Sequence, residues 1–171
     1  MLILIDAWQP EGVTKMFQDS VFMMPHLGVL STVHRDAAWN IFDKDCLIRL
    51  GTVIAPSGTA EPGEAVMTVD LTMPDGEVIE EKLEFGEIKR INLAERQEAE
   101  AVITPVRHFD MGKGPGRSVT RTVMGGVSGL LLDARGRPIS LPEEERARKE
   151  LLLNWLKALE LYPEEKLRGL M

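Results

Sequence analysis

The sequence has only one cysteine, Cys46, so no disulfide can form within the chain. It also has no charged amino-terminal stretch followed by an apolar segment and a cleavage site, the pattern that directs secretion. A reducing cytoplasm is therefore the expected compartment. Apolar runs such as Val21 to Met24 and Leu130 to Leu132 are far below the roughly 20 residues that cross a bilayer, so we expect no membrane-spanning segment.

The chain also has no excess of positive charge. Its formal net charge is −7 and its pI is near 5.1, which gives no electrostatic reason to expect a nucleic acid or an anionic membrane as partner. The length of 171 residues and the apolar content of 44% suffice for one compact domain with a core. The hydrophobic start, Met1 to Ile5, suggests a domain cut from a longer chain.

Residues 1–45 are predicted to be a helical segment that packs on, or links to, a domain outside this chain. Proline and glycine break it into short pieces: a short helix or strand, a turn at Gln9 to Gly12, a helix around Thr14 to Met23, a loop at Pro25 and a helix before Cys46. The exposed or buried state of its large side chains stays open. They form either ordinary core or a docking face, and they include Trp8, Phe17, Phe22, Met1, Met16, Met23 and Met24.

Residues 46–141 are predicted to form a small antiparallel β barrel or sandwich. Cys46 to Pro56 and the alternating segment after Glu64 are typical of strands, and Pro74 to Gly76 provides a turn into a return strand, Glu77 to Phe85. Short segments at close spacing indicate a mainly β (α+β) fold rather than a parallel α/β sheet. The four further candidate strands are Glu87 to Leu93, Ala99 to Arg107, Arg117 to Met124 and Val127 to Asp133.

Residues 142–171 are predicted to be an amphipathic helix that covers the β domain. Pro142 stands at the expected first position, acidic residues 143–145 follow in the first turn, and Pro163 is the expected stop. The apolar stripe has the spacing i, i+3, i+4, i+7 and consists of Leu152, Trp155, Leu156 and Leu159.

No catalytic, cofactor or metal site is predicted. Gly112 to Arg117 is glycine-rich but lacks the spacing of a phosphate-binding loop, which favours a hairpin loop. Gly125, Gly126 and Gly129 are interpreted as a bulge or sharp bend rather than a dinucleotide site. The histidines and Cys46 have no metal-ligand spacing, and Cys46 begins a segment typical of a buried strand.

The best candidate for a functional surface is a basic region late in the β domain. If its loops meet at one end of the barrel, they form a rim suited to a carboxylate, a phosphate or an acidic partner. The alternative is that the arginines of this region form ion pairs with acidic residues within the chain. The candidate residues are Arg117, Arg121, Asp133, Arg135, Gly136 and Arg137.

Three runs of sequence carry a resemblance to a known family. They are Ile5 to Leu30, Asp45 to Pro56 and especially Gly125 to Pro142 (GGVSGLLLDARGRPISLP). Together they resemble the carboxy-terminal third of the glutamate mutase MutL family, accessory proteins of adenosylcobalamin-dependent mutases. The larger amino-terminal part of that family resembles the sugar kinase, Hsp70 and actin type of ATPase, and its phosphate and adenosine segments do not occur here.

The resemblance implies an accessory domain, not itself an enzyme, that helps to maintain or reactivate a coenzyme B12-dependent mutase of the glutamate mutase or aminomutase type. Its implied partners are its own ATPase domain and the mutase, and a homodimer is possible. Two other functions stay open: a β-barrel module that binds a small anion, and a fragment related to hydantoinases and oxoprolinases.

Overall fold

The fold is mainly β, with two four-stranded sheets and a few helices, in a computed structural model that describes residues 1–160, 162 and 163. The strands of the first sheet lie in the order β1-β2-β8-β5, and β2 and β8 run parallel while the other pairs are antiparallel. The bounds of these strands are Gly12–Asp19 (β1), Leu47–Ala55 (β2), Leu130–Asp133 (β8) and Ile88–Ile91 (β5).

The second sheet is fully antiparallel, in the order β4-β3-β6-β7. The predicted turn at Pro74 to Gly76 joins β3 to β4, which pair from Thr72 opposite Val78 to Ala65 opposite Glu84. Period-two patterning and turn residues therefore located this hairpin correctly. The bounds are Ala65–Thr72 (β3), Val78–Glu84 (β4), Glu98–Pro105 (β6) and Val119–Met124 (β7).

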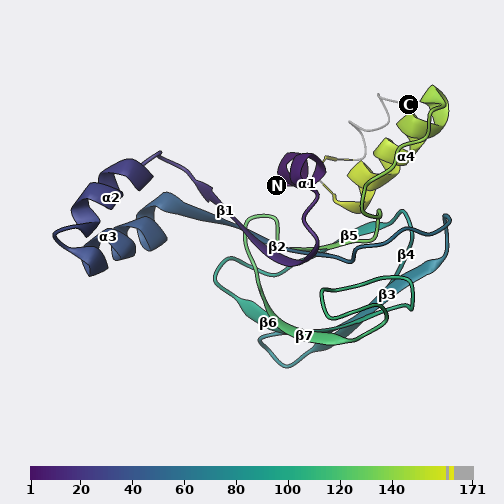
Figure 1. The fold of residues 1–171 in the computed structure, drawn as a ribbon, viewed down its shortest axis with the longest axis horizontal. Helices are drawn as coiled ribbons and strands as arrows, with labels where there is room; N and C mark the ends of the chain where they lie inside the picture. The colour runs from purple at the N-terminus through teal and green to yellow at the C-terminus, as the bar shows by residue number, and fades with distance from the viewer. Residues whose placement is uncertain (161, 164–171) are drawn as a thin grey trace.

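The main core consists of buried side chains from both sheets, and Figure 1 shows how the two sheets face each other. Ile54 and Leu132 from the first sheet join one buried cluster with Val69 and Ile103 from the second, and all four side chains are inaccessible to solvent. Burial of apolar side chains such as these is the main favourable contribution to folding. The described strands form two separate sheets and no closed barrel, so the sandwich alternative fits and the barrel is not confirmed.

A second, smaller core lies on the outer face of the first sheet, beneath α1 (Leu2–Trp8) and α4 (Glu145–Ala158). Ile5 from α1, Trp155 from α4 and Leu159, directly after α4, pack on Val53 and other residues of that sheet. The predicted carboxy-terminal helix thus covers the β domain. It begins later than expected, because the Glu144 carboxylate accepts hydrogen bonds from the amides of Arg146 and Ala147 and caps the helix.

The α4 prediction was also imprecise at its far end. The helix ends at Ala158, before Pro163, and Leu152 of the predicted stripe is exposed. The predicted tail from residue 164 to Met171 lies outside the described residues. Among the residues that the structure describes, no helix has the length and apolar character needed to cross a membrane.

The segment between β1 and β2 forms a helical hairpin at the end of a two-stranded ribbon, well away from the two sheets (Figure 1). It consists of α2 (Met24–Ser31), α3 (Arg35–Ile41) and the π-helical turn η1 (Phe42–Cys46). Leu27, Ala38 and Cys46 are buried there, yet none belongs to either main core cluster. Arg49 of β2 pairs with the Asp43 carboxylate and fixes η1 to the ribbon.

Two predictions for residues 1–45 were wrong. The expected helix at Thr14 to Met23 is largely strand β1, which pairs with β2 from Gly12 opposite Ala55 to Asp19 opposite Leu47. A partner strand distant in the sequence thus overrode local helix preference. Pro25 is not in a loop but in the first turn of α2, where its missing N–H costs nothing. The segment 1–45 is therefore partly a strand of the first sheet and not wholly helical.

Candidate functional site

A buried ion-pair network follows the end of β8. The Asp133 carboxylate accepts two hydrogen bonds from Arg135, from Nε at 2.9 Å and from Nη2 at 2.8 Å, and one from Nη2 of Arg137 at 2.9 Å. All three side chains are almost inaccessible to solvent. The two-pronged contact with Arg135 is the strongest geometry that an arginine can make with a carboxylate.

The same network fastens α1 and the turn after it to the β domain. Nη1 of Arg135 pairs with Oδ1 of Asp6 at 2.9 Å, and Nε of Arg137 donates to the carbonyl oxygen of Pro10 at 3.0 Å. The Gln9 side chain accepts a hydrogen bond from the Ile139 amide at 2.7 Å. Polar contacts thus hold residues 6–10 on the segment that follows β8.

Charge and burial act in opposite directions on these groups. Burial raises the pKa of the Asp133 carboxyl, but hydrogen bonds from Arg135 and the charges of Arg135 and Arg137 outweigh it and leave the pKa below its ordinary value. Burial lowers the pKa of Arg135, but Asp133 and Asp6 outweigh that effect and leave it raised. Asp133 and Arg135 therefore stay charged at neutral pH.

The predicted basic rim is wrong for four of its six residues, because Asp133, Arg135, Gly136 and Arg137 are buried. The alternative, ion pairs within the chain, is confirmed for Arg135 and Arg137. Asp133 lies two and four residues before them, and this close spacing in the sequence favours ion pairs between neighbours. Arg117 and Arg121 are exposed, in the loop before β7 and on β7 itself.

A cleft of about 860 Å³ lies between residues 59–62, the start of β5 and α4. Of the arginines in the predicted rim, Arg135 alone lines it. Its Nε, Nη1 and Nη2 atoms are all engaged by Asp133 and Asp6. The cleft consequently does not bring the arginines together around an anion.

The glycine-rich stretch 112–116 is a loop between the antiparallel strands β6 and β7, as predicted. One oxygen of Asp110 accepts hydrogen bonds from the amides of Gly112, Lys113 and Gly114, at 2.7, 3.0 and 2.9 Å. An acidic side chain therefore occupies the place where a phosphate-binding loop holds its anion.

The glycines at 125–129 allow two backbone segments to touch. A Cβ atom on Gly126 would lie 2.4 Å from the Arg49 carbonyl oxygen, and one on Gly51 would lie 1.9 Å from that of Gly129. The loop between β7 and β8 therefore crosses β2 at a distance that only glycine permits. Close backbone packing therefore accounts for these glycines.

No metal or nucleophile site emerges from the described part of the chain. Within residues 1–160, 162 and 163, no group of three His, Cys, Asp or Glu side chains is placed to hold a metal ion. Cys46 is buried, and burial together with Asp19 and Asp45 raises the pKa of its thiol. A protonated thiol is a poor nucleophile.

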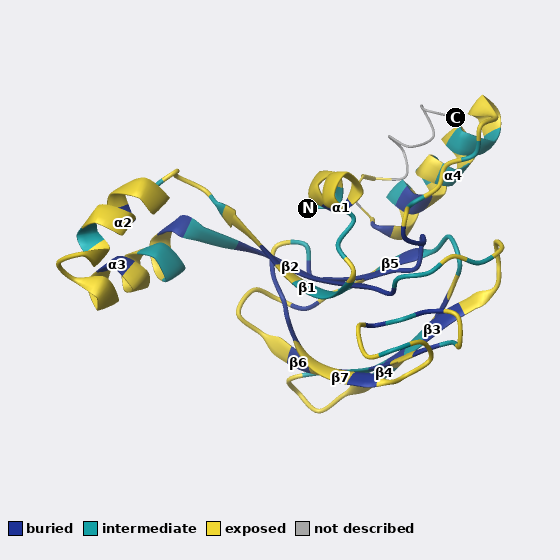
Figure 2. Cartoon of the chain, in the orientation of Figure 1, coloured by how far each residue is buried: buried dark blue, intermediate teal, exposed yellow. Residues whose placement is uncertain are grey.

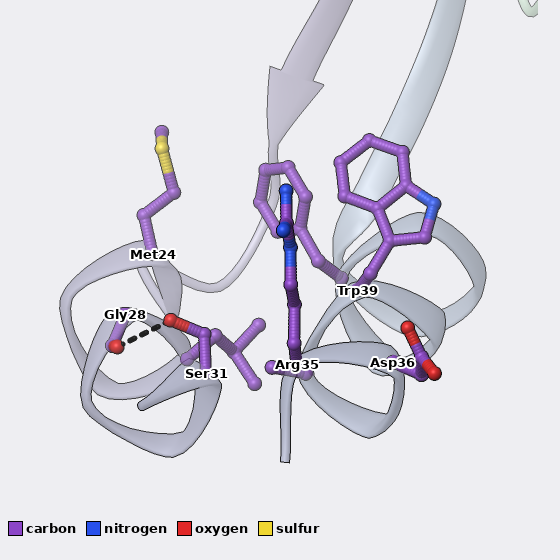
Figure 3. A pocket seen from close by; sticks show the side chains of 9 residues that line it. Met24, Gly28, Ser31, Arg35, Asp36 and Trp39 are labelled. Carbon is purple, nitrogen blue, oxygen red and sulfur yellow. Dashed lines mark hydrogen bonds between the residues drawn. The ribbon is translucent and has the colours of Figure 1, made fainter. Parts of the chain in front are cut away.

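The most distinctive surface is the exposed apolar face of the helical hairpin, coloured largely yellow in Figure 2. A groove of about 590 Å³ runs between α2 and α3. Trp39 and Phe42 stack at a tilt in it, with ring centroids 6.1 Å apart. Figure 3 shows its lining: Met24, Gly28, Ser31, Arg35, Asp36 and Trp39 are labelled, with Leu27, Ala38 and Phe42 completing the set.

The sequence left the state of the large side chains in residues 1–45 open, and the structure separates them. Trp8, Phe22 and Met24 are exposed, whereas Met16 is buried. Trp39 of α3 is 62% exposed, whereas the pattern before Cys46 predicts only a short helix and does not single out this residue. An apolar helix that has no core to cover indicates a docking surface, and this was the signal that could have identified the hairpin.

Neither a protein-family model, nor a curated protein, nor a solved structure matches this chain.

Proposed function

We propose that this chain is a protein-interaction module whose helical hairpin docks on another protein. The observation that carries the proposal is the projection of α2 and α3 beyond the two sheets with large apolar side chains facing solvent. Monomeric soluble proteins rarely expose contiguous apolar patches larger than about a few hundred Å², and larger patches commonly mark interaction sites. The exposed set on the hairpin is Val21, Phe22, Met24, Val29, Val33, Trp39 and Ile41.

The composition of α2 supports the same function. Its eight residues include no Asp, Glu, Lys or Arg, and Val29, outside the groove, is exposed as well as Met24 within it. A helix that is apolar on more than one side is normally buried on more than one side. The hairpin therefore offers apolar surface both in the groove and outside it, where Val29 and Val33 are exposed.

Phe22 adds a local argument. Its backbone is left-handed, with a φ of 55°, and its side chain is 85% exposed at the junction of β1 and α2. A bulky residue in this conformation is strained by about 1 to 3 kcal/mol, and such outliers cluster at binding sites. The strain holds an aromatic side chain outward, where a partner can cover it.

The resemblance to the glutamate mutase MutL family suggests the partner: a coenzyme B12-dependent mutase, which the module would assist or reactivate together with its own ATPase domain. Docking of the hairpin would couple movement of the ATPase to the mutase, and the module itself would catalyse no reaction. The anion-binding alternative is less well supported, because the hydrogen-bond donors of Arg135 and Arg137 are engaged within the chain.

The test is calorimetric titration of the chain into the adenosylcobalamin-dependent mutase of the same organism. Val29→Asp combined with Val33→Asp should weaken binding at least about tenfold, because a charge would be buried in an apolar contact. The matched control is Val78→Asp on β4, which changes a valine of 66% exposure remote from the hairpin. Absence of binding by the unmodified chain, or equal effects of the two changes, would overturn the proposal.

A further inference from the structure

Both helices of the hairpin present a helical stripe to the groove. Each stripe has the spacing i, i+3, i+4, i+7, the pattern by which a helix contacts another helix. A Cβ atom on Gly28 would meet nothing within 4 Å, so the groove is open at its middle. The stripe of α2 is Met24, Leu27, Gly28 and Ser31, and that of α3 and η1 is Arg35, Ala38, Trp39 and Phe42.

Two opposite charges stand in this apolar groove without pairing to each other. The extended side chain of Arg35 rises between Met24 and Trp39, and Asp36 lies on the other side of α3 (Figure 3). Among the nine lining residues the hydrogen bond drawn joins Ser31 Oγ to the Gly28 carbonyl oxygen, at 2.7 Å. The groove thus carries one positive and one negative group, both available to an occupant.

We infer that the occupant is the hairpin of a second copy of this chain, in a two-fold symmetric dimer in which Arg35 of each copy pairs with Asp36 of the other. A two-fold interface sets the same patch against itself, so it needs a surface that complements itself in charge. Arg35 and Asp36 both line the groove and carry opposite charges, so the surface meets that requirement. The inference rests on the proposed function, since it makes the same hairpin an interaction surface.

The arrangement is compatible with the shape of the molecule. The hairpin lies at the end of the β1–β2 ribbon, so two copies can join hairpin to hairpin with their β sheets apart (Figure 1). The four helices would bury the groove and leave Val29 and Val33, which do not line it, free for the partner described above. With nine groove residues a copy, against about 20 to 30 in a standard interface, the dimer should be weak, with Kd on the order of micromolar.

The test measures self-association by sedimentation equilibrium at about 1 to 200 µM, a range that spans micromolar Kd values. The unmodified chain should dimerise. Arg35→Glu should be monomeric, because the introduced glutamate would oppose Asp36 of the other copy, and Asp36→Arg should be monomeric because two arginines would then face each other. An equimolar mixture of the two variants should dimerise again, since both cross-contacts of the mixed dimer then join one carboxylate to one guanidinium.

The mixture serves as the folding control, because two misfolded variants would not restore a dimer. A monomeric unmodified chain, single variants that stay dimeric, or a mixture that stays monomeric would each overturn the inference. If the unmodified chain stays monomeric and floats with vesicles of phosphatidylcholine and phosphatidylglycerol, the groove binds lipid. That result would also overturn the inference. Mutase binding is tested by the changes at Val29 and Val33, and dimerisation by the changes at Arg35 and Asp36. Loss of dimerisation with mutase binding retained, or the opposite result, can therefore be distinguished.

Discussion

The guanidinium carbon of Arg135 lies 4.8 Å from the centroid of the Trp155 ring, a stacked cation–π contact. Trp155 also donates from Nε1 to the Gly86 carbonyl oxygen at 2.7 Å. Because Arg135 binds Asp133 and Asp6 as well, one side chain connects α4, the end of β8 and α1. The residues that the sequence suggested as a binding surface therefore hold both covering helices on the first sheet.

We expect Asp133→Asn to destabilise the fold by about 3 to 5 kcal/mol, because it leaves Arg135 and Arg137 buried without the carboxylate that they share. Urea denaturation followed by circular dichroism measures the change. The matched control is Glu100→Gln on β6, an exposed carboxylate, for which a change within about 0.5 kcal/mol is expected. Equal effects would show that the network contributes little.

Acid should weaken the same network. The pKa of Asp133 is lowered by folding, so its stabilising contribution is complete above its unfolded value of about 3.9 and is lost as pH falls through the lower folded value. The unmodified chain should therefore lose stability below about pH 4. Asp133→Asn should show a shallower slope there in denaturation curves recorded between about pH 2 and 7. A slope unchanged by the substitution would contradict the assignment.

Two glycines should respond to alanine in opposite directions. Gly51→Ala sets a Cβ atom 1.9 Å from the Gly129 carbonyl oxygen, at a φ of 131°, and should cost more than about 4 kcal/mol or prevent folding. Gly28→Ala lies within α2 with open space around it and should stabilise the hairpin by up to about 1 kcal/mol. Thermal unfolding distinguishes the two, and a tolerated Gly51→Ala would refute the close crossing.

Phe22→Asn should separate stability from binding. Asparagine tolerates the left-handed conformation better than phenylalanine, so stability should rise by up to about 1 kcal/mol. Binding to the mutase should weaken, because the exposed ring is lost. Calorimetric titration and thermal unfolding on the same samples test both effects. Weaker binding together with lower stability would show a folding role for the ring instead.

The Cys46 thiol should react slowly with a disulfide reagent at about pH 8 in the folded chain and rapidly after denaturation. Burial and the neighbouring carboxylates raise the thiol pKa, which lowers the thiolate fraction, and burial also blocks access. The comparison is a Cys46→Ala chain with Thr72→Cys, which places a thiol at an exposed position on β3. Equal rates for the two native chains would rule out protection of Cys46.

Elements that depend on local patterns could be predicted from the sequence. Alternating residues around Pro74 to Gly76 specified the β3–β4 hairpin, since a strand shows a period of two and a tight turn needs particular residues. The apolar stripe of the last helix likewise indicated its contact with the sheet, and Trp155 and Leu159 are buried there. The mainly β class followed from the number and spacing of such segments.

Features that depend on partners distant in the sequence could not be predicted in this way. Thr14 to Asp19 form a strand because they pair with the edge of β2, although their local pattern predicts a helix. Arg135 and Arg137 are buried because Asp133 and Asp6 compensate their charge, whereas isolated arginines would stay at the surface. The hairpin helices remain exposed because the ribbon carries them beyond both sheets. A local pattern states which face of an element is apolar, and the assembled fold decides whether anything within the chain covers it.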